Sequence, residues 1–237
     1  MACCFFIYGA IFGSFINVCI YRIPAGKSIV TPPSACPKCN TFIKWYDNIP
    51  ILSFFILAGR CRKCGKKISI RYPLIELLTG LLFIIFFLKF GLEKSCFFYI
   101  IIAGYLTALT FIDIDKKTVP DGIVLLMIIT GFGTGIFEFH QGINIFDGII
   151  GLCAGGFAAL CFNYFSNGKM GEGDVKLLAA LGFCTGTREI FYVIFYAFIL
   201  GGAAAAILLA AGKSSRKDPV AFVPFIAAAF VLRALIL

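Results

Sequence analysis

The chain has 237 residues, of which 60% are hydrophobic and only 14% are charged, and its mean hydropathy is +0.97. Soluble domains have an apolar share nearer to about 45–50%, so this composition excludes an ordinary soluble protein and predicts an all-α polytopic membrane protein. The formal net charge of +9 comes from residues 22–73, which contain ten Lys or Arg residues and a single acidic residue, Asp47. A basic loop beside membrane spans favours membrane lipid with anionic headgroups as its partner, and no nucleic acid is needed to explain the charge.

Apolar runs long enough to cross a bilayer recur along the whole chain. A spanning helix needs about 20 apolar residues, and on this criterion the sequence predicts about eight transmembrane helices. They lie near residues 3–21, 74–90, 96–112, 122–139, 145–165, 174–187, 189–211 and 219–237. The first run has no basic region before it and no small-residue cleavage site, so we expect it to remain as a membrane anchor. Two pairs of glycines four residues apart predict close helix packing: Gly9 with Gly13, and Gly151 with Gly155.

The distribution of Lys and Arg predicts the orientation of the chain in the membrane. Cytoplasmic loops carry the excess of these residues, so we expect the basic loop 22–73 on the cytosolic side and both termini on the other side. The other predicted inner connections agree, because they contain Lys116, Lys117, Lys169, Lys213, Arg216 and Lys217.

Two C-x-x-C pairs lie within this basic loop. Cys36 and Cys39 form the first pair, and Cys61 and Cys64 form the second pair after 21 intervening residues. This spacing is typical of a four-cysteine zinc ribbon, in which each turn directs two thiolates towards one tetrahedral ion. The alternatives are two disulfides or four idle thiols. A reducing cytosol disfavours disulfides, so the sequence predicts a cytoplasmic zinc-ribbon loop.

Two polar interruptions break the apolar pattern at the predicted cytoplasmic face. The first covers residues 112–121 and contains Asp113 at the end of an apolar run. The second covers residues 168–176, contains Asp174, and opens an apolar segment of only about 14 residues. A short or broken helix at membrane depth is tolerated where it packs in protein or lines a wet cavity, so this segment is predicted to line a site.

Asp113 and Asp174 are the candidate catalytic residues. Two carboxylates that meet in a partly dry cavity tend to share one proton, and such a pair can activate water for attack on a peptide carbonyl. Gly171 and Gly173, which have no side chains, are predicted to let an extended substrate approach Asp174. The alternative is that the two aspartates cap helices or pair with Lys116 and Lys176.

Together these residues resemble the bacterial type IV prepilin peptidases, the bifunctional leader peptidases and N-methyltransferases of pili, type II secretion and competence pseudopili. The resemblance covers nearly the whole chain. It rests on residues 13–18, 21–24, 33–34, 45–53 and 69–76, on the turn from Asp113 to Asp121, and on the G-x-G-D motif at 171–174.

The resemblance implies that Asp113 and Asp174 are catalytic and that the enzyme works at the cytoplasmic face of the bacterial inner membrane. The expected reaction cuts a short basic leader from prepilins or pseudopilins after a glycine. The expected second reaction methylates the new N-terminal amine with S-adenosylmethionine. Glu76, at the membrane edge, is a candidate to bind the amine or the cofactor, or else to pair with Arg71.

The expected domains are an anchor at 1–21, a zinc-binding and methyltransferase-associated loop at 22–73, and a transmembrane aspartyl peptidase domain at 74–237. All four metal ligands are cysteines, which leaves no open position for catalysis, so the zinc is predicted to be structural. Two other functions fit some of these features. One is a non-enzymatic module whose zinc ribbon docks a partner during pilus or secretion assembly. The other is a transporter, whose site would lie nearer to the middle of the bilayer.

Overall fold

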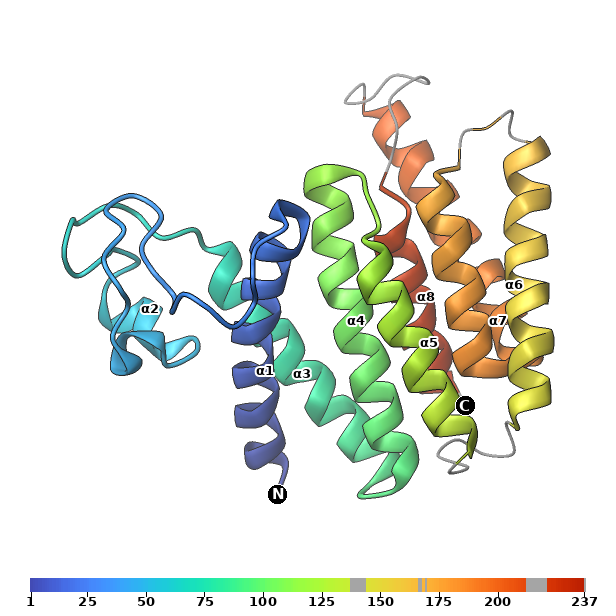
Figure 1. Cartoon of the computed structure of the whole chain (residues 1–237), viewed down its shortest axis with the longest axis horizontal. Helices are drawn as coiled ribbons and strands as arrows, with labels where there is room; N and C mark the ends of the chain where they lie inside the picture. The colour runs from blue at the N-terminus through green and yellow to red at the C-terminus, as the bar shows by residue number, and fades with distance from the viewer. Residues whose placement is uncertain (137–143, 166–167, 169, 212–220, 237) are drawn as a thin grey trace. The chain divides into compact units, whose positions relative to one another are not determined.

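The computed structural model describes residues 1–136, 144–165, 168, 170–211 and 221–236 (Figure 1). The elements in chain order are α1 (Ala2–Arg22), η1 (Ile23–Ala25), η2 (Trp45–Asn48), α2 (Leu52–Ile56), α3 (Arg71–Phe90), α4 (Lys94–Lys116), α5 (Asp121–Ile136), α6 (Ile145–Phe165), α7 (Glu172–Ala210) and α8 (Val223–Ile236). Extended structure in the described residues is limited to two isolated β-bridges. The predicted all-α class is confirmed. Lys169, Lys213, Arg216 and Lys217 lie outside the described residues.

Five helices are long and apolar enough to cross a membrane: α1 with η1, α3, α4, α6 and α7. Two shorter apolar helices are Asp121–Gly133, within α5, and α8. Several apolar helices of this length indicate a multi-pass membrane protein. The number of eight crossings stays a prediction.

Helix α7 combines two of the predicted spans and is broken between them. Gly186 has φ 80° and ψ 171°, values that no residue within an α-helix adopts. The next residue is held by the first turn of α6, because the Thr187 hydroxyl donates a hydrogen bond of 2.8 Å to Asp147 Oδ1. The sequence therefore placed a boundary correctly near residue 187, and a single glycine accounts for it.

The predicted glycine pairs mark the closest helix contacts. A side chain at Gly151 would overlap the carbonyl oxygen of Gly182 on α7, and one at Gly155 would lie 2.5 Å from the Leu178 carbonyl oxygen. On α1, a side chain at Gly9 would lie 2.8 Å from the Cα atom of Gly80 on α3. The prediction of close packing at these glycines is confirmed.

The chain forms two compact units, residues 1–92 and 93–237. Unit 1 contains α1, the loop with η1, η2 and α2, and α3; unit 2 contains α4 to α8. The predicted domain boundaries at residues 21 and 73 follow changes in composition along the chain. In the structure, α3 packs against α1 and so falls within unit 1 rather than with the later helices. That division by function stays a prediction.

Helix α4 is the most enclosed of the five long apolar helices. Within its apolar window, 72% of the residues are buried, against 22% for α6. Large side chains on α4, α7 and α8 fill the core of unit 2, among them Leu109, Leu181 and Phe230. Asp113, near the end of α4, is therefore held inside the unit, whereas the three residues after it are exposed.

Candidate active site and metal centre

Asp113 lies in the last turn of α4 and is only 6% exposed. One carboxylate oxygen, Oδ2, accepts a hydrogen bond of 3.2 Å from the backbone N–H of Val223, where α8 begins. The backbone N–H of Phe222 also hydrogen-bonds this carboxylate. Asp113 thus caps a helix that is 110 residues away in sequence, because the first amides of α8 have no partners within their own helix.

Asp174 lies in the first turn of α7 and is half-buried. Its backbone N–H donates to the carbonyl oxygen of Gly171 at 3.0 Å, and its carboxylate accepts a hydrogen bond from the N–H of the same glycine. This is the reciprocal contact that an acidic residue makes three positions into a helix. Both aspartates therefore have helix-capping contacts, as the alternative hypothesis expected. Lys176, however, pairs with Asp121 at 2.8 Å rather than with Asp174.

The structure brings the two polar interruptions together. The Asp174 carboxylate lies close enough to Asp113 to interact with its charge. Val119, in the turn after α4, lies directly against Gly173, and Lys176 on α7 forms an exposed ion pair with Asp121 at the start of α5. Both aspartates lie at helix ends rather than in the middle of an apolar stretch, which is a position that disfavours a transport site.

The two glycines of the motif have different surroundings. A Cβ atom added at Gly173 would lie 2.8 Å from Val119 Cβ, so packing within the protein already requires a glycine there. A Cβ atom added at Gly171 would lie 3.5 Å from Asp174 Oδ2, which is an ordinary contact distance. Gly171 is therefore the glycine whose small size is not explained by packing in the described residues.

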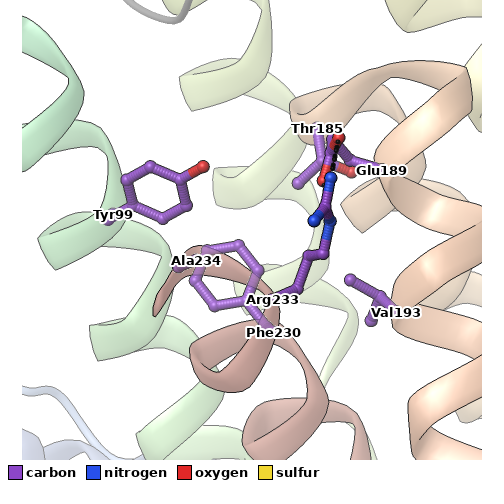
Figure 2. Close-up of a pocket in the computed structure, with 7 residues that line it drawn as sticks. All are labelled: Tyr99, Thr185, Glu189, Val193, Phe230, Arg233 and Ala234. Carbon is purple, nitrogen blue, oxygen red and sulfur yellow. Dashed lines mark hydrogen bonds and ion pairs between the residues drawn. The ribbon is translucent and has the colours of Figure 1, made fainter. Parts of the chain in front are cut away.

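A small cavity of about 10 Å³ lies at the other end of α4, between α4, α7 and α8 (Figure 2). Its lining residues are Tyr99, Thr185, Glu189, Val193, Phe230, Arg233 and Ala234. Tyr99 precedes Asp113 by 14 residues, or about 21 Å along a helix. This cavity is therefore not part of the site around the two aspartates.

The cavity is closed on one side by a nearly buried ion pair that the sequence analysis missed. Arg233 Nε lies 2.6 Å from Glu189 Oε2, with side-chain exposures of 13% and 15%. The Arg233 guanidinium also stacks on the Tyr192 ring at 4.3 Å. The available signal was Arg233, the only charged residue of the apolar run 219–237, since such a charge usually faces a partner inside a bundle.

The four predicted cysteine ligands meet in unit 1. Their Sγ atoms all lie within 4.8 Å of one another, and the Sγ atoms of Cys36 and Cys64 are 3.9 Å apart. A disulfide bond is about 2.05 Å long, whereas thiolates around a tetrahedral zinc ion with bonds of about 2.3 Å are about 3.8 Å apart. The arrangement fits a metal ion, and all four thiols are free.

Both knuckles have the same backbone turn. Cys36 N–H donates to Thr41 O, and Cys61 N–H donates to Lys66 O, each at 2.9 Å. The residue after the second cysteine has a positive φ in both turns, 54° at Asn40 and 65° at Gly65. Glycine and asparagine adopt this left-handed conformation most easily, so the local sequence accounts for both turns.

The surroundings of the knuckles shift the pKa values of three cysteines, two downwards and one upwards. Hydrogen bonding to Thr41 lowers the pKa of Cys39 to about 6. Hydrogen bonds from the backbone of Cys64 and Lys63 lower the pKa of Cys61. At Cys64 a hydrogen bond from the Lys66 backbone is outweighed by burial and by the neighbouring thiols, which raise the pKa to about 11. Because a metal binds the thiolate and not the thiol, the contacts at Cys39 and Cys61 are the ones that favour a bound cation.

An ion pair connects the second knuckle to η2. The guanidinium of Arg62, between Cys61 and Cys64, donates to both oxygens of Asp47 at 2.6–3.0 Å. Arg62 also lies 5.6 Å from the Tyr46 ring centroid. The hydrogen bonds from Arg62 hold the pKa of Asp47 below its usual value. The only acidic residue of the loop thus joins the metal-binding turn to the segment before α2.

Glu76, in the second turn of α3, is 8% exposed and is bound within unit 1. Its Oε2 atom accepts a hydrogen bond of 2.7 Å from Ile51 N–H, and the carboxylate also bonds the Ser14 side chain. Ile51 has φ 63° and ψ −54°, and Leu52 N–H bonds Pro50 O at 2.6 Å, which defines a strained γ-turn. From the sequence, Arg71 was the candidate partner of Glu76, and the hydrogen bond from the Ile51 backbone was not predicted.

Comparison with known proteins covers both units. The family described as "Bacterial Peptidase A24 N-terminal domain" matches residues 7–90, and the "Type IV leader peptidase family" matches residues 100–206. No solved structure matches the chain.

Three relatives are each named "Prepilin leader peptidase/N-methyltransferase". The Myxococcus xanthus protein is 37% identical over 220 residues, which cover 90% of this chain and 64% of the relative. The Neisseria gonorrhoeae protein is 36% identical, over 85% of this chain and 80% of the relative. The Bacillus subtilis protein is 31% identical, over 96% of this chain and 91% of the relative. The resemblance read from the sequence and the expected class of enzyme are thereby confirmed, and the chain belongs to the type IV leader peptidase family.

Proposed function

We propose that this enzyme cuts the basic leader from type IV prepilins or pseudopilins with Asp113 and Asp174, and then methylates the new N-terminal amine. The observation that carries the first step is the contact between the two polar interruptions, where Val119 lies against Gly173 and the carboxylates on α4 and α7 are within reach of each other's charge. The names of the relatives support the substrate class and the second activity.

The hydrogen bonds suggest separate roles for the two carboxylates. Two backbone amides donate to Asp113 and one donates to Asp174, so we assign the negative charge to Asp113. Asp113 takes a proton from water as the water oxygen attacks the peptide carbonyl carbon. Protonated Asp174 donates a hydrogen bond to the carbonyl oxygen and then gives its proton to the leaving amine as the C–N bond breaks. Transfer of the proton from Asp113 to Asp174 restores the starting state.

Gly171 fits a role in substrate binding. Its Cα faces the Asp174 carboxylate, and a side chain there would stand beside the reacting group. We propose that an extended substrate backbone passes over Gly171, whereas Gly173 contributes by allowing the turn at Val119 to approach.

The test compares leader release by purified wild type, Asp113→Asn and Asp174→Asn on a prepilin with a Gly–Phe junction, measured by mass. Asp121→Asn is the matched control, because Asp121 is an exposed carboxylate in the same region whose partner is Lys176. We expect both catalytic variants to lose cleavage while folding normally, and the control to keep it. Continued cleavage by both catalytic variants would refute the assignment.

For the second step we propose S-adenosylmethionine as the methyl donor, bound by unit 1 at the membrane edge. The cofactor supplies a methyl group on a positively charged sulfur. A carboxylate suits a cationic ligand or an amine, and Glu76 is the buried carboxylate of this unit. Glu76 therefore remains our candidate contact, and its bonds to Ile51 and Ser14 fix the position of its oxygens.

We propose that the cysteine cluster holds a structural Zn²⁺ ion, because four thiolates fill a tetrahedral site and leave no position for a substrate. The expected location is the bacterial inner membrane, with the cluster and the aspartates on the cytosolic side. Loss of methylation with retained cleavage in Glu76→Ala would support a separate methyl-transfer site in unit 1. Loss of both in a variant that folds and retains zinc would contradict that separation.

A further inference from the structure

Helix α2 exposes three large apolar side chains on one side within the basic loop, which elsewhere also exposes Val30, Phe42, Trp45 and Ile70. Leu52 is 59% exposed, Phe55 71% and Ile56 73%, within a helix of five residues. An exposed apolar cluster of this kind is costly in water and usually marks a contact surface.

The exposed side of α2 is fixed by contacts on its other side. Ser53 is buried and donates a hydrogen bond of 3.1 Å to the carbonyl oxygen of Tyr46. The Phe54 ring packs against Gly59, where an added Cβ would lie 3.0 Å from Cζ. Because these contacts hold the inner side, α2 cannot turn Phe55 inward without breaking them.

Unit 1 holds α2 at the depth of the apolar part of α3. Ile51, the residue before α2, donates its N–H to Glu76, and Glu76 follows Arg71 by five residues, or about 7.5 Å along the helix. The apolar run of α3 has already begun at Leu74. If α3 crosses the bilayer, α2 lies where the headgroups meet the acyl chains.

The charges around α2 match that position. The loop exposes basic residues after α2, namely Arg60, Lys63, Lys66 and Lys67. Arg60 follows the apolar face by only four residues. Apolar side chains with neighbouring basic residues are the pattern of segments that lie in the membrane interface and bind anionic lipid.

We propose that Leu52, Phe55 and Ile56 insert into the anionic leaflet as a short interfacial wedge, while the basic residues contact the headgroups. The wedge holds the metal-binding loop against the membrane. This proposal needs α1 and α3 to span the bilayer, but it does not depend on either enzymatic activity.

The chain offers a direct test because Trp45 is its only tryptophan. The variant Trp45→Phe/Phe55→Trp places a single fluorophore on the wedge, in vesicles of zwitterionic and anionic phospholipid. Lipids brominated near the carbonyl or near the methyl end of the acyl chain serve as quenchers, and iodide serves as the aqueous quencher. Trp45→Phe/Ile11→Trp is the control, because Ile11 is 52% exposed and lies 11 residues before the end of α1.

We expect Trp at position 55 to be quenched more by shallow than by deep bromines, to resist iodide, and to have a blue-shifted emission. Trp at position 11 should be quenched more by deep than by shallow bromines. Metal content and cleavage equal to wild type would show that the variant is folded. Quenching by iodide without quenching by either brominated lipid would overturn the proposal. Protection from every quencher would also overturn it, because protein would then cover α2.

Discussion

Replacing Gly173 by alanine tests whether the contact between the two polar interruptions positions the aspartates. The added Cβ would lie 2.8 Å from Val119 Cβ and 3.0 Å from Val119 Cγ2, which is closer than side-chain carbons normally come. One extra methyl group in a packed position costs about 1–3 kcal/mol. The strain is relieved if the turn moves away from α7, and a displacement of about 1 Å at a reacting group can reduce a rate about 100-fold.

We therefore expect Gly173→Ala to reduce the kcat for leader release by about 10- to 100-fold. The second substitution Val119→Gly removes both carbon atoms that the new methyl group would meet, so the double variant should recover most of the lost rate. Val119→Gly alone should have a smaller effect than Gly173→Ala. The assay is single-turnover cleavage of a prepilin, with leader release followed by mass.

Gly171→Ala is the informative comparison. Its added Cβ would lie 3.5 Å from Asp174 Oδ2, so the free enzyme should accept it without rearrangement. A loss of cleavage in Gly171→Ala that Val119→Gly does not restore would indicate an obstructed substrate. If Val119→Gly also failed to restore Gly173→Ala, the packing explanation for Gly173 would be refuted, and both glycines would belong to the substrate path.

Three further predictions concern the rest of the chain. Removing metal from the cysteine cluster with a chelator should release one zinc ion per chain and expose the loop to protease before the helices of unit 2; zinc-free protein with an equally resistant loop would contradict a structural role. Arg62 lowers the pKa of Asp47, so the ion pair between them should stabilise the loop at neutral pH and lose this effect as the pH falls below about 4. Wild type and Asp47→Asn should therefore differ in loop stability only above that pH. Glu189→Ala leaves Arg233 nearly buried without its carboxylate partner and should lower the free energy of unfolding of unit 2 by about 3–5 kcal/mol, measured by denaturant titration in detergent, whereas equal stability would show that the pair is solvated.

The cysteine cluster could be predicted from sequence because its geometry is local. Each C-x-x-C turn is closed by backbone hydrogen bonds within six residues, and the residues that need a positive φ are Asn40 and Gly65. Only the meeting of the two turns requires tertiary structure. The bends of the loop between them, such as the γ-turn at Ile51, have no comparable signal, since an isoleucine is among the least expected residues at a positive φ.

The site in unit 2 was predictable only in part, because its contacts join distant segments. The sequence indicated Asp113 and Asp174 as polar residues at the ends of apolar runs. It contained no sign that the amide of Val223 would bond Asp113 across 110 residues, or that Val119 would lie against Gly173. Capping was considered as an alternative to catalysis, yet the structure contains both the caps and the proximity of the carboxylates.

The caps and the proposed catalysis are compatible, because a helix start supplies what a shared-proton pair needs. Backbone amides are fixed dipoles that stabilise one negative charge without adding a mobile proton, and they hold the carboxylate in one orientation. Asp113 receives such amides from α8, while the start of α7 holds Asp174 by a single amide. If both carboxylates had the same surroundings, neither would be preferred as the charged base or as the protonated acid. The unequal number of amide donors gives this pair that asymmetry before any substrate binds.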